Sequence, residues 1–159
     1  MHPEISKSLF EDQVQKVLKN PELIVSRGWL VLKHEYPNLI VAMRHRRSGQ
    51  LRVFSLKFDG WNDQPPSLTL LRCDSEEELP HSQWPKNPPG KTYWHPGGWV
   101  SESGILVPSK PFMCMIGIRE YHGHQQHVKD AWENYKNQSS YELGQLLIQV
   151  SEVFQKSDV

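Results

Sequence analysis

Three short segments, Trp29-Leu-Val-Leu-Lys33, Leu39-Ile-Val-Ala-Met43 and Leu51-Arg-Val-Phe-Ser-Leu-Lys-Phe58, decide the fold of this chain. All three are rich in the β-branched and aromatic residues that favour strands. The breaks between them, Tyr36-Pro37-Asn38 and Arg47-Ser48-Gly49, have the composition of turns. The sequence therefore predicts three consecutive strands that pair as an antiparallel meander.

A fourth strand extends this meander. The segment Ser67–Leu71 follows the turn Gln64-Pro65-Pro66 and is again largely apolar. Side chains alternate between the two faces of a strand, so Phe54, Leu56 and Phe58 share one face, which we expect to be the buried one. Four antiparallel strands are thus expected between residues 29 and 71.

Helices are expected before and after the sheet. Apolar residues of Ser6–Asn20 recur at helical spacing, and Pro21 is expected to end that helix. Two helices are expected near the C-terminus, the second beginning with a capping box in which Ser139 precedes Glu142 by three residues. The apolar residues of that helix form one core-facing stripe: Leu143, Leu146, Leu147, Val150, Val153 and Phe154. The predicted fold class is α+β in a single domain, 1–159, with an N-terminal helix, a four-stranded antiparallel meander, a long Pro/Trp-rich loop and C-terminal helices.

The segment from Cys73 to Gly98 lacks regular periodicity. It contains five prolines together with Trp84 and Trp94, and Trp99 follows it directly. A loop of this length is usually either functional or disordered. Because the three tryptophans need burial, we expect an ordered loop that its aromatic rings hold in place.

Composition excludes two classes of partner. Eighteen basic residues balance eighteen acidic ones, so no net charge attracts the protein to nucleic acid or to an anionic membrane. The basic run Arg44–Arg47 lies between two predicted strands and is expected to be a solvated hairpin tip. No apolar run approaches the ~20 residues that span a bilayer, and Met1–Glu4 does not open a signal peptide. We therefore expect a soluble, cytoplasmic protein in which Cys73 and Cys114 are unpaired.

The metal-binding chemistry of the chain is concentrated in Cys114-Met-Ile-Gly-Ile-Arg-Glu120-Tyr-His122-Gly-His124-Gln-Gln-His127. One thiol, one carboxylate and three imidazoles lie within fourteen residues. Zinc takes such ligands, commonly four in a tetrahedron, at ~2.3 Å for thiolate and ~2.0–2.1 Å for imidazole. The segment is therefore predicted to bind a divalent metal ion, with zinc the expected ion.

Two conformations of this segment would select different histidines. If a strand over Phe112–Ile118 continues, the thiol, the carboxylate and the first two imidazoles share one face, and a turn at Gly117 or Gly123 must fold the segment back. If a helix begins at His124 instead, then His124 and His127 lie on one face, close enough to bind one ion together. Both arrangements stay open at this point.

The same residues have other roles open to them. Cys114 among apolar neighbours is compatible with an inert buried thiol, and Glu120 beside Arg119 is compatible with a surface ion pair. His95 is a further candidate ligand, although we expect it to hydrogen-bond loop carbonyls. Tyr121 is expected to support the site. A bound metal would be structural if the protein fills every position, and would activate water if one position is open.

The order of elements resembles the ubiquitin-conjugating enzyme fold. The resemblance rests on the predicted meander, on Pro65-Pro66 before the fourth strand and on His95-Pro96-Gly97 in the loop. That family has a His-Pro-Asn motif followed by its catalytic cysteine. At the corresponding place this chain has Gly104-Ile105-Leu106-Val107, which contains no thiol, and Cys114 lies further along.

The segment after Cys114 resembles a predicted metal-binding family named for its Cys, Glu, His and His residues. That family occurs in bacterial gene neighbourhoods of ubiquitin-like conjugation systems. The resemblance implies these ligands: Cys114, Glu120, His122 and His124, with His127 as an alternative to His124. It also implies an accessory role beside a ubiquitin-like modifier or its conjugation enzymes, including a role in defence against phage.

The sequence leads to three expected functions. The first is a zinc-binding accessory protein of a bacterial ubiquitin-like conjugation pathway. The second is an enzyme that uses either Cys114 as a thioester nucleophile, with a nearby histidine as base, or a metal-activated water. The third is a noncatalytic module with the ubiquitin-conjugating enzyme fold, which binds its partner through the Trp84–Trp99 loop.

Overall fold

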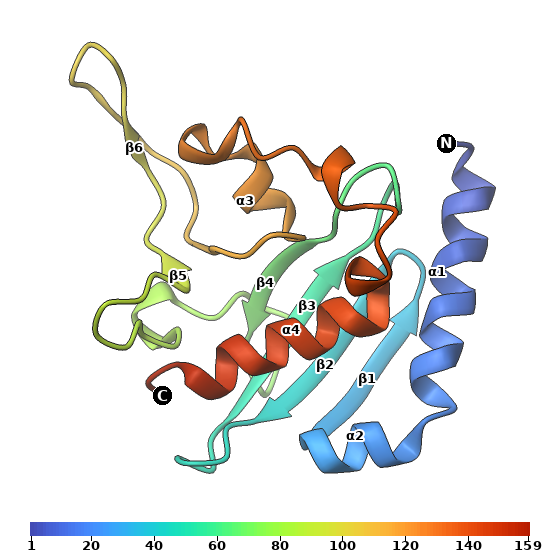
Figure 1. Ribbon diagram of the computed structural model, residues 1–159. Coiled ribbons are helices and arrows are strands. Elements are labelled where there is room, and N and C mark those ends of the chain that lie inside the picture. Colours follow the sequence, from blue (N-terminus) through green and yellow to red (C-terminus); the bar gives the residue numbers. More distant parts are fainter.

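A four-stranded antiparallel sheet forms the centre of the molecule, as the computed structural model of residues 1–159 shows (Figure 1). The strands follow one another in space in the order of the chain. The chain to the end of the sheet contains α1 (Pro3–Leu18), α2 (Pro21–Arg27), β1 (Trp29–Glu35), β2 (Asn38–Arg44), β3 (Leu51–Lys57) and β4 (Ser67–Leu71). The predicted meander is confirmed, and the fourth strand has the predicted bounds.

The rest of the chain is built from much shorter elements until its last helix. They are β5 (Trp94–His95), β6 (Trp99–Val100), β7 (Leu106–Val107), β8 (Phe112–Met113), α3 (Arg119–Gly123) and α4 (Leu143–Lys156), with single turns of 3-10 helix between them. β5 pairs with β8, and β6 pairs with β7 in a hairpin that projects from the body of the molecule (Figure 1). The predicted α+β class is confirmed.

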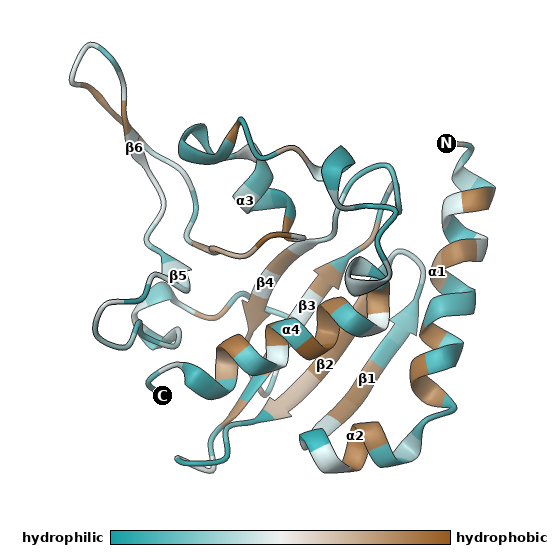
Figure 2. Ribbon diagram, viewed as in Figure 1, coloured by the Kyte–Doolittle hydropathy of each residue, from teal (hydrophilic) through white to brown (hydrophobic).

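The core lies between one face of the sheet and the two long helices. Figure 1 shows α4 crossing that face, and hydrophobic residues recur along both α4 and the central strands in Figure 2. The ring of Phe54 meets Phe154 of α4 at 5.2 Å between centroids, and Phe58 meets Phe10 of α1 at 5.3 Å. Phe54, Leu56 and Phe58 are fully buried, so the predicted inward face of the third strand is confirmed.

Pro21 does not only end the first helix, as predicted, but also begins a second one. The first helix ends at Leu18, and α2 starts at Pro21. Proline is favoured in the first turn of a helix because its missing N–H would have no partner there anyway. The side chain of Asn20 caps α2 by accepting a hydrogen bond from the Leu23 N–H at 3.2 Å. This short helix was not predicted from the sequence.

The capping box predicted at Ser139 and Glu142 is wrong. Residues Ser139–Tyr141 form a 3-10 turn, and the Glu142 side chain makes no capping bond. A side chain from α1 takes this role instead, because Gln13 Oε1 accepts a hydrogen bond from the Leu143 N–H at 3.0 Å. The apolar stripe of α4 faces the core as predicted, with five of its members buried and one half-buried: Leu143, Leu146, Leu147, Val150 and Phe154, then Val153.

The proline-rich loop is held in place by its tryptophans, as expected. Trp84 and Trp94 are buried, and their rings meet edge to face at 5.9 Å. The indole N–H of Trp94 also donates a hydrogen bond to Ser157 Oγ at 2.7 Å, which joins the loop to the end of α4. Trp99 is only half-buried. No helix of the structure is both long enough and apolar enough to cross a membrane.

The basic hairpin tip between β2 and β3 is only partly solvated. Arg46 and Arg47 are exposed as expected, but His45 is buried. Its two ring nitrogens contact Ser48 Oγ at 2.9 Å and the Ser157 carbonyl oxygen at 3.1 Å. His45 therefore contributes to packing rather than to a basic surface.

Candidate metal centre

The chain reverses direction immediately after Cys114. The strand expected over Phe112–Ile118 covers only Phe112–Met113, so the expected length is wrong. The reversal is at Gly117, whose φ of +94° is disfavoured for other residues. A Cβ atom there would lie 2.4 Å from a side-chain carbon of Leu146, so the turn also packs closely on α4. Of the two glycines considered for the turn, Gly117 makes it.

The turn brings Cys114 to His127. Their Sγ and Nε2 atoms are 3.6 Å apart, and His127 is at the end of a 3-10 turn, Gln125–His127. The ring of Tyr121 stacks on the imidazole of His127 with 4.0 Å between centroids and 22° between planes. The structure therefore pairs the thiol with His127, one of the two histidines that the sequence left as alternatives.

His124 lies beside this pair but has hydrogen bonds of its own. Its ring centroid is 5.9 Å from that of His127 and 4.6 Å from that of His95. Nδ1 accepts a hydrogen bond from the Gln126 N–H at 3.3 Å, and Nε2 lies 3.2 Å from the carbonyl oxygen of Gly98. These partners are compatible with a neutral ring that carries its proton on Nε2. His124 is also buried, with 5% of its surface exposed.

His95 is at the far end of the same row of rings. It stacks on Phe112 with 4.7 Å between centroids, and its Nδ1 accepts a hydrogen bond from the Gly97 N–H at 3.0 Å. We expected a bond to a loop carbonyl, but the partner is a loop amide. Burial lowers the pKa of His95, and the neighbouring His124 and His127 lower it further. His95 is thus a neutral, packed side chain in the structure.

His122 has both ring nitrogens occupied by the backbone. Nε2 accepts a hydrogen bond from the Gly117 N–H at 3.0 Å, and Nδ1 lies 2.7 Å from the carbonyl oxygen of Asp130. The ring therefore joins the turn after Cys114 to the segment that follows His127. In this arrangement His122 holds the backbone and offers no free nitrogen to a metal.

Glu120 faces the sheet. Its Oε1 accepts hydrogen bonds from the Ser67 hydroxyl and from the Leu68 N–H, the latter at 3.1 Å, so α3 is joined to the start of β4. Its Oε2 is buried without a partner. Burial raises the pKa of this carboxyl group against the opposing effect of its hydrogen bonds. Of the four residues that the resemblance implied, Glu120, His122 and His124 thus already have hydrogen-bond partners away from Cys114.

Electrostatics keep the thiol and the imidazole in their neutral forms. Burial raises the pKa of the Cys114 thiol. Burial also lowers the pKa of His127, with His124 adding to the effect and Asp130 opposing it. At neutral pH the pair is therefore a thiol beside a neutral imidazole.

Asp130 belongs to the site although it was not predicted from the sequence. Its carboxylate accepts hydrogen bonds from the hydroxyl groups of Tyr121, at 2.6 Å, and Tyr135. These bonds lower the pKa of Asp130. They also add to the effect of burial, which raises the pKa of Tyr121. The sequence held one signal for its role in the site: Asp130 is an acidic residue three positions after His127, which is within one helical turn.

The Cys114–His127 pair suits one zinc ion in distance and in chemistry. Two ligands of a tetrahedral zinc ion at ~2.3 Å and ~2.0–2.1 Å lie ~3.6 Å apart, and the observed separation is 3.6 Å. Sulfur and imidazole are donors that zinc accepts readily. No group of three or more His, Cys, Asp or Glu side chains in the structure is placed to hold a metal ion. A complete site therefore requires another side chain to turn toward the pair.

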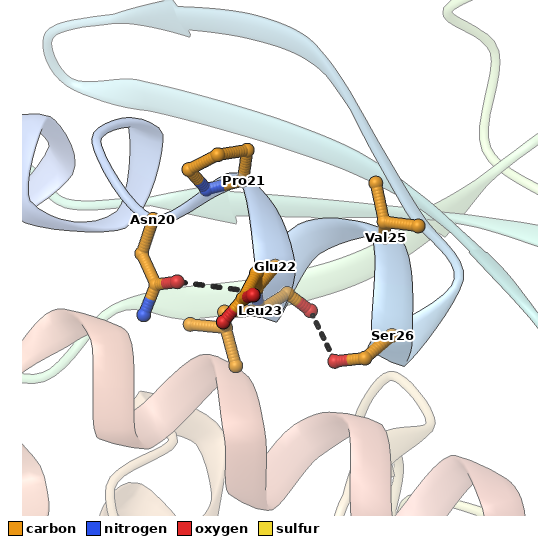
Figure 3. A pocket seen from close by; sticks show the side chains of 6 residues that line it. All are labelled: Asn20, Pro21, Glu22, Leu23, Val25 and Ser26. Atoms are coloured by element: carbon orange, nitrogen blue, oxygen red, sulfur yellow. Dashed lines mark hydrogen bonds between the residues drawn. The ribbon is translucent and has the colours of Figure 1, made fainter.

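The hollows of the surface differ in what lines them. A hollow of about 770 Å³ beside α2 is lined by Asn20, Leu23 and Ser26 among others, and contains no thiol or imidazole. Figure 3 shows that the side chains of Asn20 and Ser26 make hydrogen bonds to the backbone of the helix itself. A smaller cleft of about 340 Å³ is lined by residues that include Phe112 and His124, so it lies directly beside the candidate site.

Comparisons with known proteins name no relative for this site. No family model matches the chain, and no curated protein matches it. The chemistry assigned to the site therefore rests on the geometry of its own residues.

Proposed function

We propose that the protein binds a zinc ion at Cys114 and His127 and acts as an accessory protein of a bacterial ubiquitin-like conjugation pathway in the cytoplasm. The zinc site in this proposal rests on one observation, the distance of 3.6 Å between Cys114 Sγ and His127 Nε2. It equals the separation of two such ligands on one tetrahedral ion, about 3.6 Å. A thiol and an imidazole thirteen residues apart in the chain have this spacing only because Gly117 reverses the backbone.

The metal would add a further link between two segments that the His122 ring already joins. Cys114 follows β8, and His127 ends the 3-10 turn after α3. A zinc ion bound to both would staple this turn to the region of the sheet, which is what structural zinc sites do in small proteins. His124 is the neighbouring imidazole that would supply a third ligand, and His95 lies next in the row.

The pathway part of the proposal is supported by the resemblance of the layout to ubiquitin-conjugating enzymes. The sheet order β1-β2-β3-β4, with α1 before it and α4 after it, agrees with that layout. Pro65-Pro66 precedes β4, and His95-Pro96-Gly97 lies in the loop that follows the sheet. The proposed partner is a ubiquitin-like modifier or one of its conjugation enzymes, and the proposed setting includes defence against phage.

Metal content tests the first part. Purified protein is expected to contain about one zinc per chain by elemental analysis, and the Cys114→Ser and His127→Gln variants are expected to lose it. Cys73→Ser is the matched control, since Cys73 is the other free cysteine and is exposed outside the site. His34→Gln, an exposed residue on β1, is the control for the histidine. A chain without zinc, or equal zinc in all four variants, would contradict the proposal.

A second candidate function uses the same pair without a metal. The Cys114 thiol is within hydrogen-bond distance of the His127 imidazole, so a base lies beside a potential nucleophile. When the sulfur attacks an activated acyl group, the thiol proton would pass to Nε2, the sulfur–carbon bond would form and the leaving group would depart. The product would be a thioester on Cys114.

The two candidates give different results with an activated modifier. A nucleophile is expected to form an adduct that a thiol reductant removes and that Cys114→Ala abolishes. A chelator would leave this adduct unchanged, because this candidate uses the pair without a metal. A zinc protein would form no adduct with or without a chelator. The third function expected from the sequence, a binding module in the Trp84–Trp99 loop, receives less support because Trp84 and Trp94 are buried.

A further inference from the structure

The outer face of the sheet is apolar although neither long helix covers it. Both of those helices lie against the other face, where they form the core with Phe54 and Phe58 (Figure 1). Side chains that alternate with the core residues along each strand point to the outer face. The strand register joins four of them in a row that crosses every strand: Leu30, Ala42, Val53 and Leu71. The solvated face of an antiparallel sheet is usually polar, so an apolar row indicates a contact surface.

Apolar side chains of this outer face are most open to solvent along β1. Three members of the row pack with Ile40, from the next row of the same face, in a buried cluster that is separate from the core. Leu30, the fourth member, is 61% exposed, and Leu32, in the bulge of β1, is 52% exposed. The face therefore combines a buried apolar floor with two exposed leucines at its β1 edge.

One end of the outer face has two opposite charges. Glu35 pairs across the strands with Asn38, and Asn38 pairs with Lys57, so the three side chains lie in one row. Figure 2 shows the change along β1 from hydrophobic residues to hydrophilic ones towards its end. Glu35 and Lys57 are exposed, and neither takes part in an ion pair within the chain. A free carboxylate on β1 and a free ammonium on β3 thus lie on either side of β2.

These positions make the face complementary to itself. A two-fold axis along β2 would place β1 of one copy over β3 of the other. Leu30 would then meet Val53 and Glu35 would meet Lys57, and each of these contacts would occur twice. An axis across the strands would instead place Lys57 over Leu51, at the opposite end of β3. The first arrangement matches apolar with apolar side chains and each charge with its opposite.

We propose that the protein forms a symmetric dimer through the outer face of the sheet, with Glu35 of each copy paired with Lys57 of the other. Four strands of up to seven residues give a face about 19 Å wide and about 24 Å long. Two such faces would bury about 1,000 Å², the area of a weak specific complex. Basic and acidic residues are equal in number, so no net charge opposes self-association. The dimer is independent of the proposed zinc site.

Sedimentation velocity over a range of concentrations of the full chain tests the dimer. A dissociation constant of about 10–100 µM is expected for an interface of this size. Leu30→Glu would bury a charge in the apolar contact and is expected to weaken the dimer at least about tenfold. Leu30 is exposed in the single chain, so this variant should fold. A urea melt at low concentration, where the dimer dissociates, checks the folding of each variant as a monomer.

Charge reversal tests how the two copies are arranged. Glu35→Lys alone and Lys57→Glu alone would each set like charges against one another twice, and each is expected to weaken the dimer about tenfold. When the two variants are mixed in equal amounts, a dimer with one copy of each has both ion pairs again, so dimerisation should return. Glu11→Lys, an exposed change on α1, is the matched control and should dimerise like the wild type.

The proposal is supported if Leu30→Glu and both single reversals weaken the dimer and mixing the two reversed variants restores it. A monomer at every concentration would overturn it and leave this face to a partner of another kind. A dimer that none of these changes affects would place the interface elsewhere. A dimer that is sensitive to Leu30→Glu but not to charge reversal, or that mixing does not restore, would contradict the pairing of Glu35 with Lys57. Zinc content has no part in any of these results.

Discussion

The sheet with its two long helices and the segment from Tyr93 to Asp130 are stabilised by different forces. The first region is a continuous apolar core in which Phe54, Leu56 and Phe154 are fully buried. The second region has strands of two residues and a helix of five, too short to be stable alone. It contributes buried apolar residues of its own, Trp94, Phe112, Met113 and Ile118, and it is also held by polar side chains that bond to the backbone. The first region depends chiefly on burial of apolar surface, and the second depends on individual hydrogen bonds as well.

This difference explains which side chains of the motif remain free. His122, His124 and His95 all bond to backbone groups, and Glu120 bonds to the start of β4. A backbone with so little regular structure needs such partners, since a buried N–H or C=O without one costs about 1–3 kcal/mol. Most of the potential ligands therefore already hydrogen-bond other parts of the protein, and the Cys114–His127 pair has the fewest such bonds.

The largest expected effect is in the apolar region. Phe54→Ala should lower the free energy of unfolding by about 3–5 kcal/mol, because it removes a fully buried ring and leaves a cavity. Chemical denaturation of the metal-free protein measures this. Leu30→Ala, on the exposed side of β1, is the control and should change stability by less than about 0.5 kcal/mol. Similar losses in the two variants would show that the sheet core does not dominate stability.

A smaller and more local effect is expected in the polar region. His122→Ala leaves the Gly117 N–H and the Asp130 carbonyl without their partner and should cost about 1–3 kcal/mol. Hydrogen exchange should become faster at Gly117 and in the segment after it, while the amides of β2 and β3 keep their protection. His34→Ala is the control, since His34 is exposed on β1. Uniform loss of protection across the sheet would show that the two regions unfold together.

The smallest expected effect is a loss of stability in the polar region as the pH falls. The hydrogen bonds from Tyr121 and Tyr135 hold the pKa of Asp130 below its ordinary value. The ionised carboxylate therefore stabilises the fold fully above about pH 4, the ordinary range for Asp, and the contribution is lost as pH falls through the lowered pKa. We expect at most about 1 kcal/mol, because Asp130 is partly exposed.

Acid titration of the Asp130→Asn variant measures that contribution. The variant should lose less stability than the wild type between pH 5 and pH 2, whereas Asp74→Asn, in an exposed loop, should follow the wild type. Identical curves for all three proteins would mean that the tyrosine–carboxylate bonds do not contribute to stability.

Local pattern was informative where apolar residues recur over a whole element. The four strands and the core-facing stripe of α4 were predicted because burial of one face imposes a period of two or 3.6 residues. The same logic failed for α2, which is too short to show a period. It also failed at Ser139, because the partner of the Leu143 N–H is Gln13, a residue 130 positions away.

The candidate site was predictable in composition but not in geometry. Alternation along a strand would have placed Cys114 on one face with Glu120, His122 and His124. The strand ends at Met113, however, and the turn at Gly117 changes the direction in which every later side chain points. The pairing with His127 was one of the open alternatives. Nothing in the local sequence indicates that the carbonyl of Gly98 faces His124, since these groups come from segments 26 residues apart.

The amino-acid sequence alone was enough for the α+β class, the strand order and the stretch in which one thiol, one carboxylate and three imidazoles gather. These properties follow from short-range periodicity and from residue type, which any window of the chain displays. Tertiary structure decided which histidine meets the thiol and which ones hold the backbone. That choice depends on hydrogen bonds between distant segments, and their donors and acceptors come together only when the core has packed.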